Sequence, residues 1–402
     1  MAGSSSRERI LAAVDGAAGS PVPCSFMIFR ALRAQCRDEF EFALRQQSMG
    51  LDARVQLEDL AVRVSPQVTV REWVEPGPGD RSLLHRAYDT PAGQIAAAVK
   101  QTADWPHGDR LPIFDDYFTP RAVKFPVSGL PDLESLRYLF APPTADDIAT
   151  FRAQAAPRKQ FADQHGFLLA GGWKSQRFVD GEDKGLVGDN GGTGTVIDTL
   201  MWLCGGTEPL MWAYDCPDFL SQLVGLIEDW NRARLEVHLD IGVDLIMRRA
   251  WYEGTEFWSP TLFRRFILPG LTREVDIVHQ AGARYGYIIT SGMLPIADAL
   301  LESGVDVIIG VDPGEGKGTT LAEVATALGG RVGLWGGVSG PLVVEEGTEA
   351  EVRRAVEDAV AVLGASGRFV LSPVDNVRAD TERAWRNVQV FIDTWKSLTC
   401  GG

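Results

Sequence analysis

Short apolar runs rich in β-branched residues recur along the C-terminal half of the chain. Each is followed by a polar or glycine-rich turn and then by a stretch with helical periodicity. The apolar runs predict five strands, at Val243–Arg249, Arg284–Thr290, Val305–Val311, Arg331–Gly337 and Arg368–Ser372. The helical stretches are Ser259–Gln280, Leu294–Ser303, Thr319–Leu328, Thr348–Leu363 and Thr381–Leu398. Consecutive strand–helix units of this kind indicate parallel strands joined by right-handed crossovers.

Similar elements occur upstream. Val22–Phe29 and Gly166–Trp173 predict two further strands, and Leu210–Asp240 predicts a helix. The chain therefore holds seven or eight β/α units, which is the number that a closed barrel needs. We predict an α/β fold of the (β/α)₈ TIM-barrel type, and a doubly wound open sheet is the alternative.

Residues 51–140 break the repeating pattern. Val68–Trp73, Leu84–Thr90 and Gln94–Lys100 predict strands, and the turn Pro91-Ala92-Gly93 predicts that the last two form a β-hairpin. We predict that residues 1–402 form a single barrel domain. Within it, residues 51–140 are expected to be an inserted α+β segment that caps one end.

Composition narrows the classes of partner. The chain has 402 residues, of which 45% are hydrophobic and 23% charged, as in a folded globular protein. Its net charge of −15 repels phosphate backbones, which argues against a nucleic-acid partner. No apolar run is long enough to span a membrane, and the first residues lack the apolar core of a signal peptide, so we expect a cytoplasmic protein. The five cysteines form no C-x-x-C pair, so neither a disulfide framework nor a thiolate zinc site is predicted.

The predicted strand ends supply the candidate chemistry, because the active site of a β/α barrel lies at the C-terminal ends of its strands. These ends carry acids, arginines, aromatic residues and small hydroxyls, without histidine or cysteine. Several have plainer alternatives as turn, capping or solvated residues. The catalytic candidates are Tyr252, Glu253, Asp312 and Asp375, and the substrate-binding candidates are Arg30, Arg33, Arg177, Trp251, Ser291 and Asn376.

The order of short motifs along the C-terminal half resembles the uroporphyrinogen decarboxylase superfamily. Residues 251–313 hold Trp-Tyr-Glu-Gly, then Ser-Pro, then a helix that ends at Ala-Gly, then Gly-Val-Asp and Asp-Pro. Residues 7–13 and 21–23 resemble the N-terminal part of the same superfamily, and residues 336–338 and 372–373 resemble its last two strand ends. The resemblance implies a (β/α)₈ barrel that is often dimeric. It also implies one of two chemistries, which are the cofactor-free decarboxylation used in porphyrin biosynthesis and methyl transfer that involves corrinoid proteins.

The chain departs from both chemistries at specific positions. Members that bind zinc carry His-x-Cys after the strand that here ends at Thr290, but this chain has Ile289 and Ser291 at those positions. Isoleucine and serine are not zinc ligands, so we predict no metal. True uroporphyrinogen decarboxylases carry an arginine- and tyrosine-containing motif after the first strand. Here Arg30 and Arg33 match its arginines with altered spacing, and the tyrosine is absent.

We therefore predict a cofactor-free carboxy-lyase that acts on a small carboxylated molecule. Arginine side chains at the strand ends (Arg30, Arg33 and Arg177) would pair with substrate carboxylates, because a guanidinium matches a carboxylate bidentately. Glu253 or Asp312 would protonate or orient the substrate, and Tyr252 would donate a hydrogen bond.

Two other functions stay open at this point. The first is a zinc-independent methyltransferase or demethylase component that works with a corrinoid protein and holds a methylated cation against Trp251, Tyr252 and Trp258. The second is a binding protein on a barrel without activity.

Overall fold

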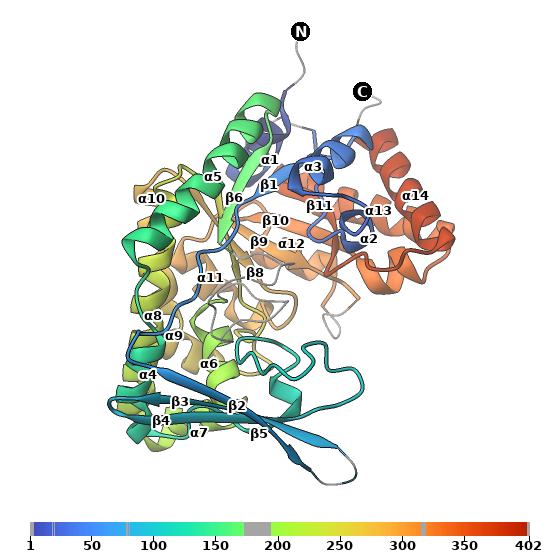
Figure 1. Cartoon of the computed structure of the whole chain (residues 1–402). Coiled ribbons are helices and arrows are strands. Elements are labelled where there is room, and N and C mark those ends of the chain that lie inside the picture. Colours follow the sequence, from blue (N-terminus) through green and yellow to red (C-terminus); the bar gives the residue numbers. More distant parts are fainter. Residues whose placement is uncertain are drawn as a thin grey trace.

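A computed structural model of the chain describes residues 4–17, 19, 21–77, 79, 81–172, 194–314 and 319–399 (Figure 1). Arg177, one of the predicted substrate-binding residues, lies outside the described residues. Across these ranges, no helix combines the length and the apolar character needed to cross a bilayer.

The centre of the molecule is a curled sheet of seven parallel strands. The predicted strands of the C-terminal half all form, each shifted by at most a few residues from its predicted bounds. In spatial order the strands are β1 (Arg54–Gln56), β6 (Leu168–Gly172), β7 (Leu245–Arg249), β8 (Arg284–Ile288), β9 (Val307–Val311), β10 (Gly333–Ser339) and β11 (Phe369–Val374). Their chain order follows their spatial order, as expected for successive β/α units.

The two edges of this sheet are bonded to one short segment. Ser25 donates its backbone N–H to the carbonyl of Leu371 on β11 at 3.0 Å, and Asp52, just before β1, donates to the carbonyl of Cys24 at 2.7 Å. The predicted strand Val22–Phe29 is thus reduced to an isolated parallel bridge between Cys24 and Leu371. Proline explains part of the shortening, because Pro21 and Pro23 have no N–H to donate to a ladder.

Helices cover the outer face of the curled sheet (Figure 1). The predicted helix at 259–280 is broken at Leu268-Pro269, and the one at 210–240 is broken at Cys216-Pro217, because proline cannot donate the backbone hydrogen bond of a helix interior. The helices are α1 (Ser6–Asp15), α2 (Arg30–Arg33), α3 (Glu39–Ser48), α4 (Leu133–Leu139), α5 (Ala145–His165), α6 (Val196–Cys204), α7 (Glu208–Asp215), α8 (Pro217–Leu239), α9 (Pro260–Phe266), α10 (Leu268–Gln280), α11 (Ala297–Ser303), α12 (Leu321–Leu328), α13 (Glu349–Leu363) and α14 (Glu382–Thr399). Short turns of 3₁₀ helix at Thr119–Arg121, Leu130–Asp132, Leu294–Ile296 and Gly364–Ser366, and a π-helical turn at Gly340–Glu345, complete the helical elements.

Alternate residues of each strand enter two separate apolar cores. The inner faces of the strands pack against one another and against α1, which contributes Ile10, Ala13 and Val14 to this inner core. The outer faces pack beneath the surrounding helices in a larger cluster. Because α1 contacts β6, β10 and β11, it covers the end of the sheet where the strands begin. In β/α barrels the binding site lies at the other end, where the strands finish.

A second, antiparallel sheet lies at the opposite end of the molecule from α1 (Figure 1). It is formed by β2 (Thr69–Pro76), β3 (Ser82–Thr90), β4 (Gly93–Lys100) and β5 (Ala122–Lys124). β3 and β4 make a hairpin in which Thr90 faces Gly93 across the turn. β1 lies within residues 51–140 but belongs to the parallel sheet, so this segment contributes to both sheets. That residues 51–140 are an insertion in a single barrel domain stays a prediction.

Candidate active site

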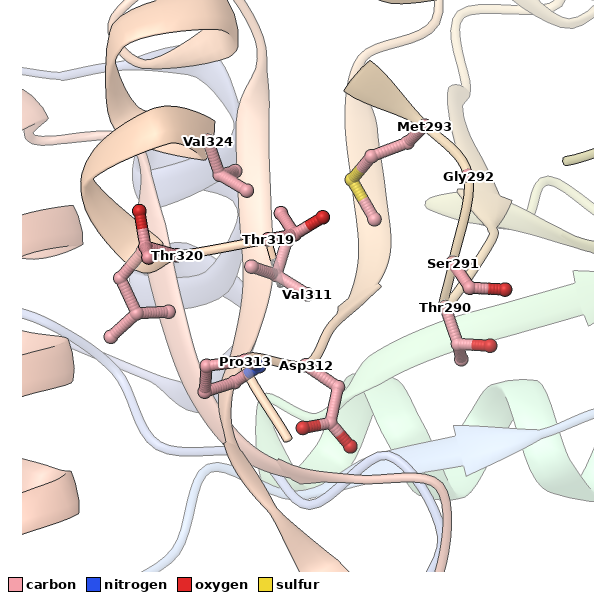
Figure 2. Close-up of a pocket in the computed structure, with 11 residues that line it drawn as sticks. Thr290, Ser291, Gly292, Met293, Val311, Asp312, Pro313, Thr319, Thr320 and Val324 are labelled. Atoms are coloured by element: carbon pink, nitrogen blue, oxygen red, sulfur yellow. The ribbon is translucent and has the colours of Figure 1, made fainter. Parts of the chain in front are cut away.

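Asp312 follows β9 and lies at the C-terminal end of the parallel sheet. Its side chain is 3% exposed, and Oδ1 accepts a hydrogen bond from the backbone N–H of Gly314 at 2.7 Å. Asp312 lines a small cavity, with about 10 Å³ of room for the centre of a water-sized sphere, together with Thr290, Ser291 and Met293 from the segment after β8. Figure 2 shows Asp312 and Pro313 on one side of this cavity and Thr290 and Ser291 on the other.

Asp375 follows β11 and has an unusual backbone. Its φ of 62° is in the left-handed region, which costs energy for a residue with a side chain and is typical of functional positions. Its side chain is 28% exposed, so a ligand can reach it. Burial raises the pKa of its carboxyl, and the nearby acids Asp312 and Glu345 raise it further, whereas Arg378 lowers it. Asp375 therefore favours the protonated, neutral form more than an ordinary aspartate does.

Arg30 and Asn376 meet beside these acids. The backbone N–H of Arg30 donates to Oδ1 of Asn376 at 3.3 Å, and the Arg30 side chain is exposed. Arg33 lies one turn further along α2, and its Nη2 is 3.9 Å from a carboxylate oxygen of Glu39. The structure thus brings Asp312, Asp375, Asn376 and the backbone of Arg30 to one side of the C-terminal end. The Arg33 guanidinium instead lies against Glu39 and the ring of Phe42.

Arg249 is a buried arginine at the end of strand β7. It binds residues on the other side of the C-terminal end of the parallel sheet. Its Nη2 donates to both carboxylate oxygens of Asp116, at 2.7 and 2.8 Å, and its Nη1 is 3.1 Å from Oδ2 of Asp198. The guanidinium lies 4.1 Å from the ring centroid of Trp251 and also faces the rings of Trp202 and Tyr252. Two aspartate side chains and three aromatic rings thus surround this cation.

Asp198, in the first turn of α6, completes this cluster. It is fully buried, and Oδ1 accepts the backbone N–H of Tyr252 at 3.2 Å. Burial raises the pKa of Asp198 to about 8, although Arg249 opposes the shift. The Tyr252 hydroxyl donates to Asp116 at 3.2 Å, and burial raises its pKa as well. Tyr252 is therefore a neutral hydrogen-bond donor at neutral pH.

Glu253 lies apart from Asp312. Its carboxylate accepts a hydrogen bond from the hydroxyl of Tyr287, a residue whose side chain points outward from β8 into the cluster beneath the helices. Burial raises the pKa of Glu253 to about 7, and the hydrogen bonds to Thr195 and Tyr287 oppose this shift. Glu253 lines a cavity between α6, α8 and α10 that does not include Asp312 or Ser291.

Sequence reasoning missed Arg249, Asp198 and Asp116. The apolar pattern predicts Arg249 only as the last residue of a strand. A charged residue at that position is itself a signal, since strand ends face the site of a barrel. Asp198 and Asp116 lie in segments without a motif, so no local pattern marked them. The roles predicted for Tyr252, Glu253, Trp251 and the other candidates stay predictions.

The sequence of residues 186–398 matches the family model described as "Uroporphyrinogen decarboxylase (URO-D)". This match covers more than half of the chain, from before α6 to the end of α14. The chain belongs to the uroporphyrinogen decarboxylase family. The resemblance seen in its motifs is thereby confirmed.

One solved structure has a similar overall fold. A methyltransferase from Methanosarcina mazei is similar over 98% of this chain and 99% of its own, with 16% sequence identity and a TM-score of 0.58. A B12-independent methionine synthase from Shewanella sp. W3-18-1 is similar over 90% of this chain and 86% of its own, with 8% identity and a TM-score of 0.45. No curated protein matches the sequence. At these identities, the likeness to the methyltransferase concerns the fold alone.

In this URO-D family member, Ile289 and Ser291 occupy the two positions where zinc-binding members carry histidine and cysteine. Ile289 is buried in the outer cluster, and Ser291 lines the cavity beside Asp312. Within the described ranges, histidine, cysteine and carboxylate side chains form no group of three that could hold a metal ion. That the protein works without a metal stays a prediction.

Proposed function

We propose that the protein is a decarboxylase that removes CO₂ from a small molecule whose carboxylate is attached to an electron-rich carbon framework. The observation that carries this proposal is the position of Asp375, which is partly exposed, adjoins a second acid and has a raised pKa. Such a carboxyl group keeps its proton to a higher pH and can give it to carbon, as general acids do.

We also infer that the segment around Cys24 takes the place of the eighth strand of a (β/α)₈ barrel.

The proposed reaction needs no cofactor. Asp375 gives its proton to the carbon that bears the carboxylate, which leaves a positive charge on the framework. The bond from that carbon to the carboxylate then breaks, its electron pair returns to the framework, and CO₂ leaves. Asp375 regains a proton from water. The electron-rich framework serves as the electron sink, and Asp312 helps to keep Asp375 protonated through its negative charge.

The arginines of α2 are the proposed anchors for substrate carboxylates. Arg30 is exposed beside Asn376, and a guanidinium can bind a carboxylate with two parallel hydrogen bonds. Arg33 lies one turn from Arg30 on α2, and Glu39 offsets part of the charge of Arg33. Arg177 keeps the anchoring role predicted from the sequence. Ser291 is proposed to contact the substrate from the opposite wall of the cavity in Figure 2.

Methyl transfer from a methylated donor to a corrinoid protein is the second candidate. The fold likeness to a methanogen methyltransferase over almost the whole chain favours it. One feature weighs against the predicted cation cage, because Arg249 already covers the faces of Trp251 and Tyr252, and Trp258 is fully buried. A methylated cation would have to compete with the chain's own guanidinium for these rings.

Two parallel assays separate the candidates. In the first, the protein is incubated without corrinoid with uroporphyrinogen and a set of pyrrole and hydroxyaromatic carboxylic acids, and released CO₂ is measured. In the second, it is mixed with cob(I)alamin and methylated amines or ethers, and methylcobalamin is followed by its absorbance spectrum. The proposal expects CO₂ in the first assay. Methylcobalamin formation without any CO₂ release would overturn it in favour of the methyltransferase.

A further inference from the structure

Arg54 is a cationic side chain inside the curled sheet that the reaction described above does not use. It occupies the first position of β1, and its neighbour Val55 belongs to the outer cluster, so Arg54 points inward. Its guanidinium carbon lies 5.8 Å from the ring centroid of Trp335, which belongs to the inner core. The indole N–H of Trp335 donates a 2.8 Å hydrogen bond to the carbonyl of Ser25, and this bond fixes the orientation of the ring beside the Arg54 guanidinium.

The partners of Arg54 are neutral. Nη1 donates to the carbonyl of Phe26 at 2.9 Å, and Nη2 donates to the carbonyl of Met27 at 2.5 Å. These bonds use two of the five N–H donors of a guanidinium. In the part of the chain that the structure describes, no carboxylate lies within 4 Å of the Arg54 guanidinium, and Glu39 is the acid that acts on its pKa. This contrasts with Arg249, whose guanidinium is paired with the Asp116 carboxylate and also lies beside Asp198.

A positive charge that is removed from bulk water without an anion is unfavourable, and binding an anion relieves this cost. Burial lowers the pKa of Arg54 to about 10, so the side chain is still charged at neutral pH. Arg54 and Gln56, both on the inner face of β1, are only partly buried, so solvent reaches this part of the interior.

We propose that Arg54 binds a carboxylate of the substrate inside the barrel, against the ring of Trp335. This inference rests on the proposed function, because it takes the substrate to be a carboxylic acid. The carboxylate bound here is one that the substrate keeps. A guanidinium on the departing group would stabilise the charged reactant more than neutral CO₂ and would slow the reaction. The substrate class is thus a molecule with at least two carboxylates, one held by Arg54 and another lost near Asp375.

The test is a binding measurement that requires no turnover. Benzoate and its neutral, equally shaped analogue benzamide are titrated calorimetrically into the wild-type protein, Arg54→Met and Arg54→Lys. Arg152→Gln is the control, because Arg152 is a half-exposed arginine on α5 that pairs with Asp240. We expect wild type and Arg152→Gln to bind benzoate at least about tenfold more tightly than benzamide. Arg54→Met should lose this preference. Arg54→Lys should keep part of it, because lysine retains the charge without the planar fork.

Equal benzoate affinity in wild type and in a folded Arg54→Met protein would overturn the proposal, as would the absence of a benzoate preference in wild type. If Arg54→Met does not fold, Arg54→Lys decides, and unchanged benzoate affinity in that variant overturns the proposal. Benzoate binding that depends on Arg54, in a protein that releases no CO₂ from any acid, would support the anion site and contradict the decarboxylase. The two claims therefore fail separately.

Discussion

Arg249 at the end of β7 holds both carboxylate oxygens of Asp116, at 2.7 and 2.8 Å. Asp116 lies between β4 and β5, so this pair joins the antiparallel sheet region to the C-terminal end of the parallel sheet. Arg249 is 2% exposed, and the side chain of Asp116 is 27% exposed. The pair thus fixes the wall of the candidate site beside Trp251 and Tyr252.

Replacement of Asp116 should destabilise the fold more than replacement of a surface partner. Asp116→Ala leaves Arg249 with Asp198 alone, and we expect a loss of about 1–3 kcal/mol in the free energy of unfolding. The matched control is Asp89→Ala, which breaks an exposed pair with Arg71 of similar two-contact geometry. That change should cost no more than about 1 kcal/mol. Urea unfolding of both variants provides the comparison, and equal losses would show that the Arg249 pair has no special structural role.

The raised pKa of Asp198 predicts a pH dependence of stability. The folded protein holds this proton up to about pH 8, whereas the unfolded chain releases it near the ordinary value of 3.8. Unfolding between these pH values therefore releases a proton, so stability falls as pH rises, by at most about 1.4 kcal/mol per pH unit for one group. Asp198→Asn removes this contribution, since asparagine resembles the protonated acid.

The stability of Asp198→Asn relative to wild type should accordingly increase from pH 5 to pH 8 and change little above it. Glu253, whose pKa is also raised, acts in the same direction in both proteins and cancels in the difference. Unfolding curves at several pH values test this. A difference that is constant with pH would mean that Asp198 is ionised in the folded protein throughout the range.

Replacement of Glu253, the acid that follows β7, tests whether this residue takes part in the reaction. The structure encloses it beside Tyr287, in a cavity separate from that of Asp312. We therefore expect Glu253→Gln to keep turnover within about tenfold of wild type and to change stability little below pH 7, where Glu253 is already protonated. A fall in turnover on the order of 10²-fold, in a variant of unchanged stability, would bear out the catalytic role that the sequence predicts for Glu253.

The contrast between Glu253 and Asp312 shows where sequence reasoning stops. The apolar runs predict the strands because each buried strand has the same local pattern of apolar residues followed by a turn. The residues that follow those strands then include Asp312 and Asp375 as candidates. The direction of a side chain after the strand end depends on the turn. The turn at 250–253 brings the Glu253 N–H to the carbonyl of Ala250, and the Glu253 carboxylate meets an outward-facing tyrosine. Asp116 was missed for a related reason, since its contact with Arg249 spans more than a hundred residues and leaves no local signal.

The backbone at Asp375 offers a test of strain at the proposed acid. Glycine adopts a φ of 62° without the steric cost that a side chain pays. Asp375→Gly should therefore raise the free energy of unfolding by up to about 1 kcal/mol while removing activity. Asp375→Asn is the control, because asparagine cannot become charged beside Asp312 and keeps a side chain of similar shape. A gain in both variants would assign the effect to charge repulsion, and a gain in glycine alone would assign it to backbone strain.

The central claim is that Asp375 gives the proton that replaces CO₂. Its most direct test is the rate of ¹³CO₂ release from a ¹³C-carboxylated acid that the wild-type protein decarboxylates, measured side by side for wild type and Asp375→Asn without any corrinoid. We predict a fall on the order of 10²-fold or more in the variant, with its melting temperature close to that of wild type. Equal rates of CO₂ release in the two proteins would contradict the account.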